Sequence, residues 1–181
     1  MKNFILIGSI VLIVLLTSNK IKASSLTEED KNRLLAVSYL GNQSYPLGIR
    51  NNNPGNLKDD GSQWQGRMTS DSKGFVRFTA FVWGVRALIK QIRDASLLKH
   101  NLYTIEGLIK RYSPPSDNNP ENLYNYIDFL NKHTGFQNGI IPDRESVTIK
   151  LLVTGIADFE NGRSRVIDDE IYFFAELLSY T

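Results

Sequence analysis

The segment from Asp143 to Phe159 constrains the fold most, because its apolar residues are spaced so that a helix here would have almost no polar face. As a helix it would carry apolar side chains around nearly its whole circumference, namely Val147, Ile149, Leu151, Leu152, Val153, Ile156, Ala157 and Phe159. Lys150 is the only charged residue between Glu145 and Asp158. A helix that is apolar on all sides is normally buried. The sequence therefore predicts a domain built around this one helix.

Five other segments carry the apolar periodicity and capping residues of helices. Thr27 is a good N-cap before an acidic first turn, and Asn119 with Pro120 is a good cap and first helical position. Gly135 and Gly162 are natural C-terminal stops. The expected helices span 27 to about 41, 81 to 99, 104 to 112, 119 to 134, and 168 or 169 toward the C-terminus.

Residues 46–79 lack helical periodicity and are rich in glycine and asparagine. Such residues mark turns and loops. Within the segment, Gly74 to Phe78 alternates like a short strand. The sequence therefore predicts a mainly α fold of the α+β class, with a small irregular or β segment around residues 46–79.

Residues 1–24 have the pattern of a secretory signal peptide. Lys2 precedes an uncharged run over 4–16, and a polar stretch leads to Ala23. The run is shorter than the roughly 20 residues of a membrane span and fits a signal h-region. Ile21 lies three residues before the expected cleavage site, where a small residue is preferred, and it fits that preference poorly. A retained N-terminal anchor is therefore the alternative. Either way, residues 25–181 are expected to form one exported domain, periplasmic or extracellular, which touches a membrane only through an uncleaved N-terminal segment.

Charge and cysteine content exclude some classes of function. The chain has 21 Lys plus Arg and 19 Asp plus Glu, and Lys2, Lys20 and Lys22 belong to the expected signal, which leaves 18 bases against 19 acids. Nucleic-acid binding needs a concentrated positive face, so this balance argues against it. Without cysteines, an exported domain must be stabilised by its apolar core alone.

Glu160 is the candidate catalytic residue, because it lies at the end of the expected buried helix. Burial disfavours the charged form of a carboxyl group and raises its pKa. A carboxyl that keeps its proton near neutral pH can act as the general acid in glycoside cleavage. The alternative is that Glu160 only caps the helix or pairs with Arg163 or Arg165.

The segment from Gly48 to Lys58, GIRNNNPGNLK, resembles the signature of a phage virion-protein family that also occurs in prophages. Further matching motifs are WQG at 64–66, FVRF at 75–78, GVRA at 84–87, YSPPS at 112–116 and ENG at 160–162. Asp117 departs from the pattern, which has glutamate there. The resemblance covers about residues 47–163 and implies that virion proteins could be partners.

The same region is similar in kind to bacterial wall glucosaminidases and related lysozyme-like enzymes. Those enzymes begin with a helix ending in glutamate, followed by an Asn-rich turn, a W-x-G motif and an aromatic strand. Here the glutamate-bearing helix comes last, so the likeness implies a lysozyme-like fold in permuted order. Permutation is tolerated where chain termini lie close together.

The Asn-rich loop is a candidate for sugar binding, because asparagine amides both donate and accept hydrogen bonds. A tryptophan could stack on a sugar ring, and a tyrosine could position it. The expected substrate-binding residues are Asn51, Asn52, Asn53, Asn56, Trp64 and Tyr112. One alternative is that the asparagines only shape the turn. Another is that the aromatic residues, which include Tyr126 and Trp83, only pack in the core.

The remaining polar residues suggest no cofactor. Asp59, Asp60 and Asp71 fit solvated turns better than a second catalytic carboxylate. His100 and His133 have no partner at the spacing of metal ligands, so neither a metal nor another cofactor is expected.

These patterns lead to two functional hypotheses. The first is an exported, phage-derived, lysozyme-like enzyme that cleaves the glycan strands of peptidoglycan, either by hydrolysis or by transglycosylation. The second is a non-catalytic virion or peptidoglycan-binding protein with the same fold.

Overall fold

A computed structural model describes residues 26–114, 116 and 119–181. The expected signal peptide or anchor at residues 1–24 lies outside the described residues. The helical elements are α2 (Glu28–Ala36), α3 (Leu47–Arg50), α4 (Phe81–Lys90), the π-helix η1 (Gln91–Lys99), α5 (Ile105–Tyr112), α6 (Pro120–Thr134), the 3-10 helix η2 (Gln137–Gly139), α7 (Ser146–Asn161) and α8 (Asp169–Leu178). Two short strands, β1 (Arg67–Met68) and β2 (Arg77–Phe78), complete the fold.

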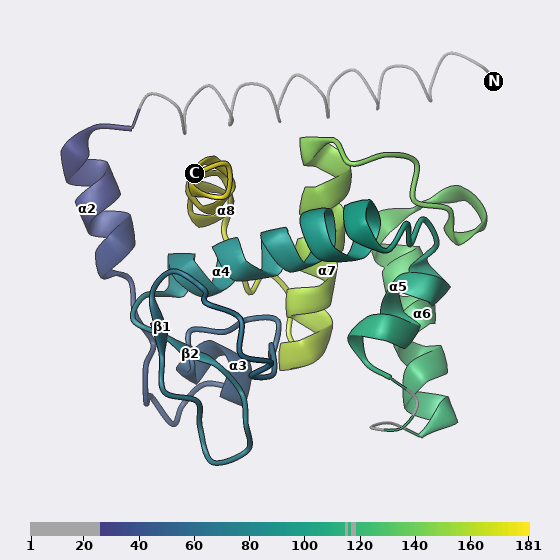
Figure 1. The fold of residues 1–181 in the computed structure, drawn as a ribbon, viewed down its shortest axis with the longest axis horizontal. Helices are drawn as coiled ribbons and strands as arrows, with labels where there is room; N and C mark the ends of the chain where they lie inside the picture. The colour runs from purple at the N-terminus through teal and green to yellow at the C-terminus, as the bar shows by residue number, and fades with distance from the viewer. Residues whose placement is uncertain (1–25, 115, 117–118) are drawn as a thin grey trace.

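The helix α7 lies at the centre of the fold, as its apolar circumference predicts. None of its residues is exposed, and it packs against α3, α4, η1 and α6 (Figure 1). It begins at Ser146, three residues later than expected, because Asp143 forms a turn in which its carboxylate accepts the N–H of Glu145. Gly162 ends α7 in the left-handed conformation, with φ of 60°.

Most of the predicted helix ends are confirmed. Thr27 forms a capping box with Asp30, and Thr104, Asn119 and Asp168 each cap a helix through the side-chain oxygen. The helix α2 stops at Ala36 instead of near Gly41, because Val37 is extended and its carbonyl oxygen accepts the N–H of Phe81.

The segment predicted as one helix over 81–99 changes geometry at Gln91. From there the chain forms the π-helix η1, in which the Ser96 hydroxyl donates to the carbonyl oxygen of Gln91. A π turn contains more residues than an α turn, so the positions that face the core differ from those expected from an α-helical period. Ser96 and Leu97 are therefore buried, whereas Ala95, expected inside from α-helical spacing, is only half-buried.

The irregular segment forms a small lobe beside α4 and the end of α7 (Figure 1). In its antiparallel sheet, Arg67 lies opposite Phe78 and Met68 opposite Arg77, and an isolated bridge joins Lys58 to Phe75. The short helix α3 was not predicted, because four residues are too few to show a period. The protein is therefore mainly helical with a small antiparallel sheet, which confirms the α+β class.

A single cluster of buried apolar residues connects the lobe to the helices. Ile49, Val76 and Phe78 of the lobe belong to the same cluster as Val85 of α4 and Ile156 of α7. Among the described residues, no helix is both long enough and apolar enough to span a bilayer.

Candidate functional site

A pocket of about 500 Å³ lies where the C-terminal end of α7 meets the lobe and the end of α5. In Figure 1 this end of α7 lies between the two-stranded lobe and the pair α5–α6. The residues that line the pocket are Asn56, Leu57, Lys58, Asp60, Trp64, Phe75, Gln91, Arg111, Tyr112, Ser113, Pro114 and Glu160. Of the residues predicted from sequence, the structure thus brings together Glu160, Asn56, Trp64 and Tyr112.

The carboxylate of Glu160 is held by two neutral donors. The Asn56 amide donates to one oxygen at 2.9 Å, and the Tyr126 hydroxyl donates to the other at 3.0 Å. Burial raises the pKa of Glu160, and these two hydrogen bonds offset only part of that increase. Among the described residues Glu160 has no ion-pair partner, so the alternative in which Arg163 or Arg165 neutralises it does not fit the structure.

Two tyrosines lie next to Glu160, and both do more than pack. Tyr126 stacks on Phe159 with ring centroids 3.8 Å apart, which fixes its hydroxyl toward the carboxylate. The Tyr112 hydroxyl donates to the carbonyl oxygen of Gly55 and so connects α5 to the Asn-rich loop. Burial, with the nearby Glu160 charge, raises the pKa of both phenols well above the ordinary value, so both remain protonated donors. For Tyr126, sequence reasoning favoured core packing because no local pattern showed this contact.

The first three asparagines of the loop do not line the pocket. Asn51, Asn52 and Asn53 are all at least 95% buried. The Asn52 amide binds Ser38 and the carbonyl oxygen of Phe78, and the Asn53 amide binds the carbonyl oxygens of Leu57 and Val76. Their hydrogen bonds are made inside the lobe, so the predicted substrate-binding role does not fit them. The Asn52 and Asn53 amides instead satisfy backbone carbonyl groups of a lobe that has little regular structure, and the Asn51 amide binds the Asp71 carboxylate.

Asn161 is a site residue that sequence reasoning missed. Its amide donates to the carbonyl oxygen of Pro54 at 2.8 Å, and its side-chain oxygen accepts the N–H of Ile49 at 3.2 Å. These bonds hold the Asn-rich loop against the end of α7, which places Asn56 opposite Glu160. The available signal was its position directly after the candidate acid in the ENG motif.

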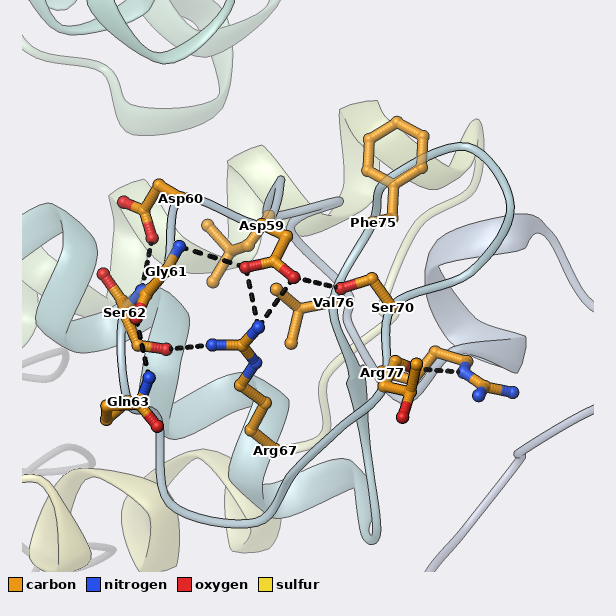
Figure 2. A network of polar contacts seen from close by, with 12 residues as sticks. Asp59, Asp60, Gly61, Ser62, Gln63, Arg67, Ser70, Phe75, Val76 and Arg77 are labelled. Atoms are coloured by element: carbon orange, nitrogen blue, oxygen red, sulfur yellow. Dashed lines mark hydrogen bonds and ion pairs between the residues drawn. The ribbon is translucent and has the colours of Figure 1, made fainter.

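Asp60 provides a second carboxylate on the pocket wall. A hydrogen bond from Ser62 lowers its pKa, whereas burial raises the pKa of Glu160, so the two carboxyl groups are shifted in opposite directions. Asp59 instead pairs with Arg67 at 2.7 Å and accepts from Ser70 at 2.6 Å, in the network of Figure 2. Asp71 accepts backbone N–H groups in its own turn, as expected for a turn residue. Of the three aspartates, only Asp60 lines this pocket.

The described residues contain no group of three or more His, Cys, Asp or Glu side chains arranged to hold a metal ion. A ring nitrogen of His133 instead lies 3.2 Å from the Thr154 hydroxyl, where α6 packs on α7.

The raised pKa of Glu160 predicts a pH-dependent contribution to stability. The folded state binds this proton more tightly than the unfolded state, so the contribution is present below the unfolded pKa of about 4.3. It falls as the pH rises and is lost once the pH exceeds the raised folded pKa. Urea unfolding between about pH 4 and pH 8 should show wild type losing stability relative to Glu160→Gln, whose side chain does not titrate. Parallel curves for the two proteins would contradict the raised pKa.

Comparison with known proteins gives one phage relative. The chain is 36% identical to Protein P5 of Pseudoalteromonas phage PM2 over 131 residues, which is 68% of this chain and 76% of that protein. No protein-family model matches the chain. The relative supports the phage origin that the motifs implied.

Proposed function

The chain belongs to the family of Protein P5 of phage PM2, and from this premise we propose that it is a phage-derived protein that cleaves the glycan strands of the bacterial cell wall. Glu160 is the general acid, and the fold is lysozyme-like with the acid-bearing helix placed after the Asn-rich loop and the W-x-G motif instead of before them. The N-terminal segment exports the domain to the periplasm or the cell exterior, where this substrate is found.

The observation that carries the proposal is the environment of the Glu160 carboxyl. It is desolvated, it is held by two neutral donors, and it faces a pocket large enough for a sugar. Glycoside cleavage requires a carboxylic acid that donates a proton to the leaving oxygen.

The pocket walls suit an amino-sugar polymer. Trp64 and Phe75 offer aromatic surface, and Asn56 and Gln91 offer amides for hydroxyl and N-acetyl groups. Asp60 supplies a carboxylate of lowered pKa in the same pocket. Two carboxyl groups whose pKa values are pushed apart are a typical acid and base pair. An ionised Asp60 could activate water or stabilise a cationic sugar.

The second candidate is a non-catalytic virion component that binds peptidoglycan. The phage relative favours it at least as well as it favours an enzyme. In this case the pocket holds a glycan without cutting it, and virion proteins are the partners.

A cleavage assay separates the two candidates. The purified protein is incubated with isolated peptidoglycan, and the released fragments are identified by mass spectrometry. New saccharide ends support the enzyme, and an anhydro ring would identify transglycosylation. Co-sedimentation of the folded protein with intact peptidoglycan, without any fragments, would support the binding protein and overturn the enzyme.

The Tyr126 hydroxyl predicts the pH dependence of cleavage. Its hydrogen bond lowers the pKa of Glu160, so Tyr126→Phe should raise that pKa further. A general acid must be protonated to act, so the alkaline limb of the pH–rate profile should move to higher pH. Tyr124→Phe is the matched control, because Tyr124 lies on the same helix but is 70% exposed. An unchanged limb in Tyr126→Phe would contradict the role of this contact.

A further inference from the structure

A second pocket, of about 280 Å³, lies on another face of the small lobe. Three basic side chains, Arg50, Lys73 and Arg77, help to line it, and the single acid is Asp71. It shares no lining residue with the pocket that contains Glu160. Because the acidic and basic residues of 25–181 nearly balance, this concentration of positive charge is local.

The three bases keep most of their hydrogen-bonding capacity for a ligand. Arg50 donates from one guanidinium nitrogen to the neutral side chain of Gln43. Arg77 donates from its Nε to the carbonyl oxygen of Thr69 at 2.7 Å, and its two terminal nitrogens extend away from that contact (Figure 2). Among the described residues, none of the three bases forms an ion pair within 4.0 Å.

Asp71 offsets one of the three positive charges, so the lining keeps a net positive charge, and its carboxylate oxygens are already bound by neutral donors. One oxygen accepts the N–H groups of Lys73 and Phe75, and the other accepts the Asn51 amide at 2.7 Å. These bonds also lower the pKa of Asp71, although burial opposes them. Its function is to form the turn that presents Lys73 to the pocket.

We propose that the pocket formed by Arg50, Lys73 and Arg77 binds a phosphate group. Guanidinium groups bind phosphate oxygens in pairs, and a lysine adds a point charge. A phosphate carries more charge and more oxygens than a carboxylate, so it makes better use of three bases around one cavity. Ser72 also lines the pocket. The site is independent of glycan cleavage and would hold the protein on a phosphate-bearing surface.

Titration calorimetry with inorganic phosphate at low ionic strength tests the site. The full chain should bind phosphate saturably, and Arg50→Gln or Arg77→Gln should weaken binding about tenfold each. Arg144→Gln is the matched control, since it removes an equal charge from an exposed residue that lines neither pocket. Acetate, a carboxylate, is titrated in the same way and should bind more weakly than phosphate.

Two sources of phosphate are distinguished by sedimentation. Vesicles of phosphatidylglycerol present a lipid phosphate, and a phosphorylated wall polymer presents a carbohydrate phosphate. Binding to either one that is weakened in both arginine variants supports the site and names the source. Absence of saturable phosphate binding, equal loss in Arg144→Gln, or equal affinity for acetate would overturn the proposal. None of these results depends on whether glycan is cleaved.

Discussion

Glu160→Gln should abolish clearing of permeabilised cells and release of fragments from peptidoglycan, with a rate loss of at least about 100-fold. Glutamine has nearly the same shape but cannot transfer a proton to the leaving oxygen. The Tyr126 hydroxyl can still donate to its amide oxygen. The Asn56 amide can turn over and accept the new N–H through its Oδ1, which has no partner among the described residues. The variant should therefore fold normally and still sediment with the wall, because only proton transfer is removed.

Glu176→Gln is a useful control for this experiment. Glu176 is also a buried glutamate at a helix end, with 3% of its surface exposed, but it lies on α8 and does not line the pocket. It should retain the wild-type rate of cleavage. If Glu160→Gln clears cells as fast as wild type, Glu160 is not the general acid. A folded wild type that binds the wall and never cleaves it would leave the binding protein as the function.

Gly84→Ala should destabilise the domain by about 3 kcal/mol, a large part of the stability of a domain of this size. A Cβ on Gly84 would overlap the carbonyl oxygen of Asn52 far inside van der Waals contact. This obstacle is backbone, and the buried Asn52 side chain is fixed by hydrogen bonds to Ser38 and Phe78. Neither α4 nor the loop can therefore move away without breaking other contacts. Chemical denaturation measures the loss.

Gly107→Ala is the matched substitution, because it also lies in a helix. Its Cβ would approach the Thr104 hydroxyl at 2.9 Å and Leu102 at 3.8 Å, which are side-chain atoms and not backbone, so relief requires only a small shift at the Thr104 cap. The expected change is within about 1 kcal/mol, since alanine also favours helix more than glycine does. If the two variants were equally stable, the close approach of α4 to the Asn-rich loop would not exist in solution.

The helices could be predicted because their signals are local. Caps at Thr27, Thr104 and Asn119 and the apolar circumference of α7 are visible within one or two turns of sequence. The π-helix after Gln91 could not be predicted, since its widened turn follows no residue pattern that an α period would reveal. The end of α2 was also missed, because it depends on a contact with Phe81 that is distant in sequence.

The site was predictable only in part, for a related reason. Glu160 was found because burial follows from the helix that carries it. The roles of Tyr126 and Asn161 depend on contacts 34 and 107 residues away, to Glu160 and Pro54. The amides of Asn51, Asn52 and Asn53 have the right chemistry for sugars, but the structure uses them for internal hydrogen bonds. Composition alone cannot distinguish these two uses.

The last turn of α7 carries both Glu160 and Asn161, and this adjacency makes the site sensitive to fraying. Consecutive side chains on a helix point in directions about 100° apart. Glu160 therefore faces the pocket, while Asn161 forms hydrogen bonds with the loop. Unwinding of this one turn would displace the proton donor and release the loop in the same event. Because local openings cost less than global unfolding, heat should inactivate the pocket before the domain melts. Substitutions that rigidify the turn around Gly162 should then raise the temperature at which the protein loses activity, although they add no contact to the substrate.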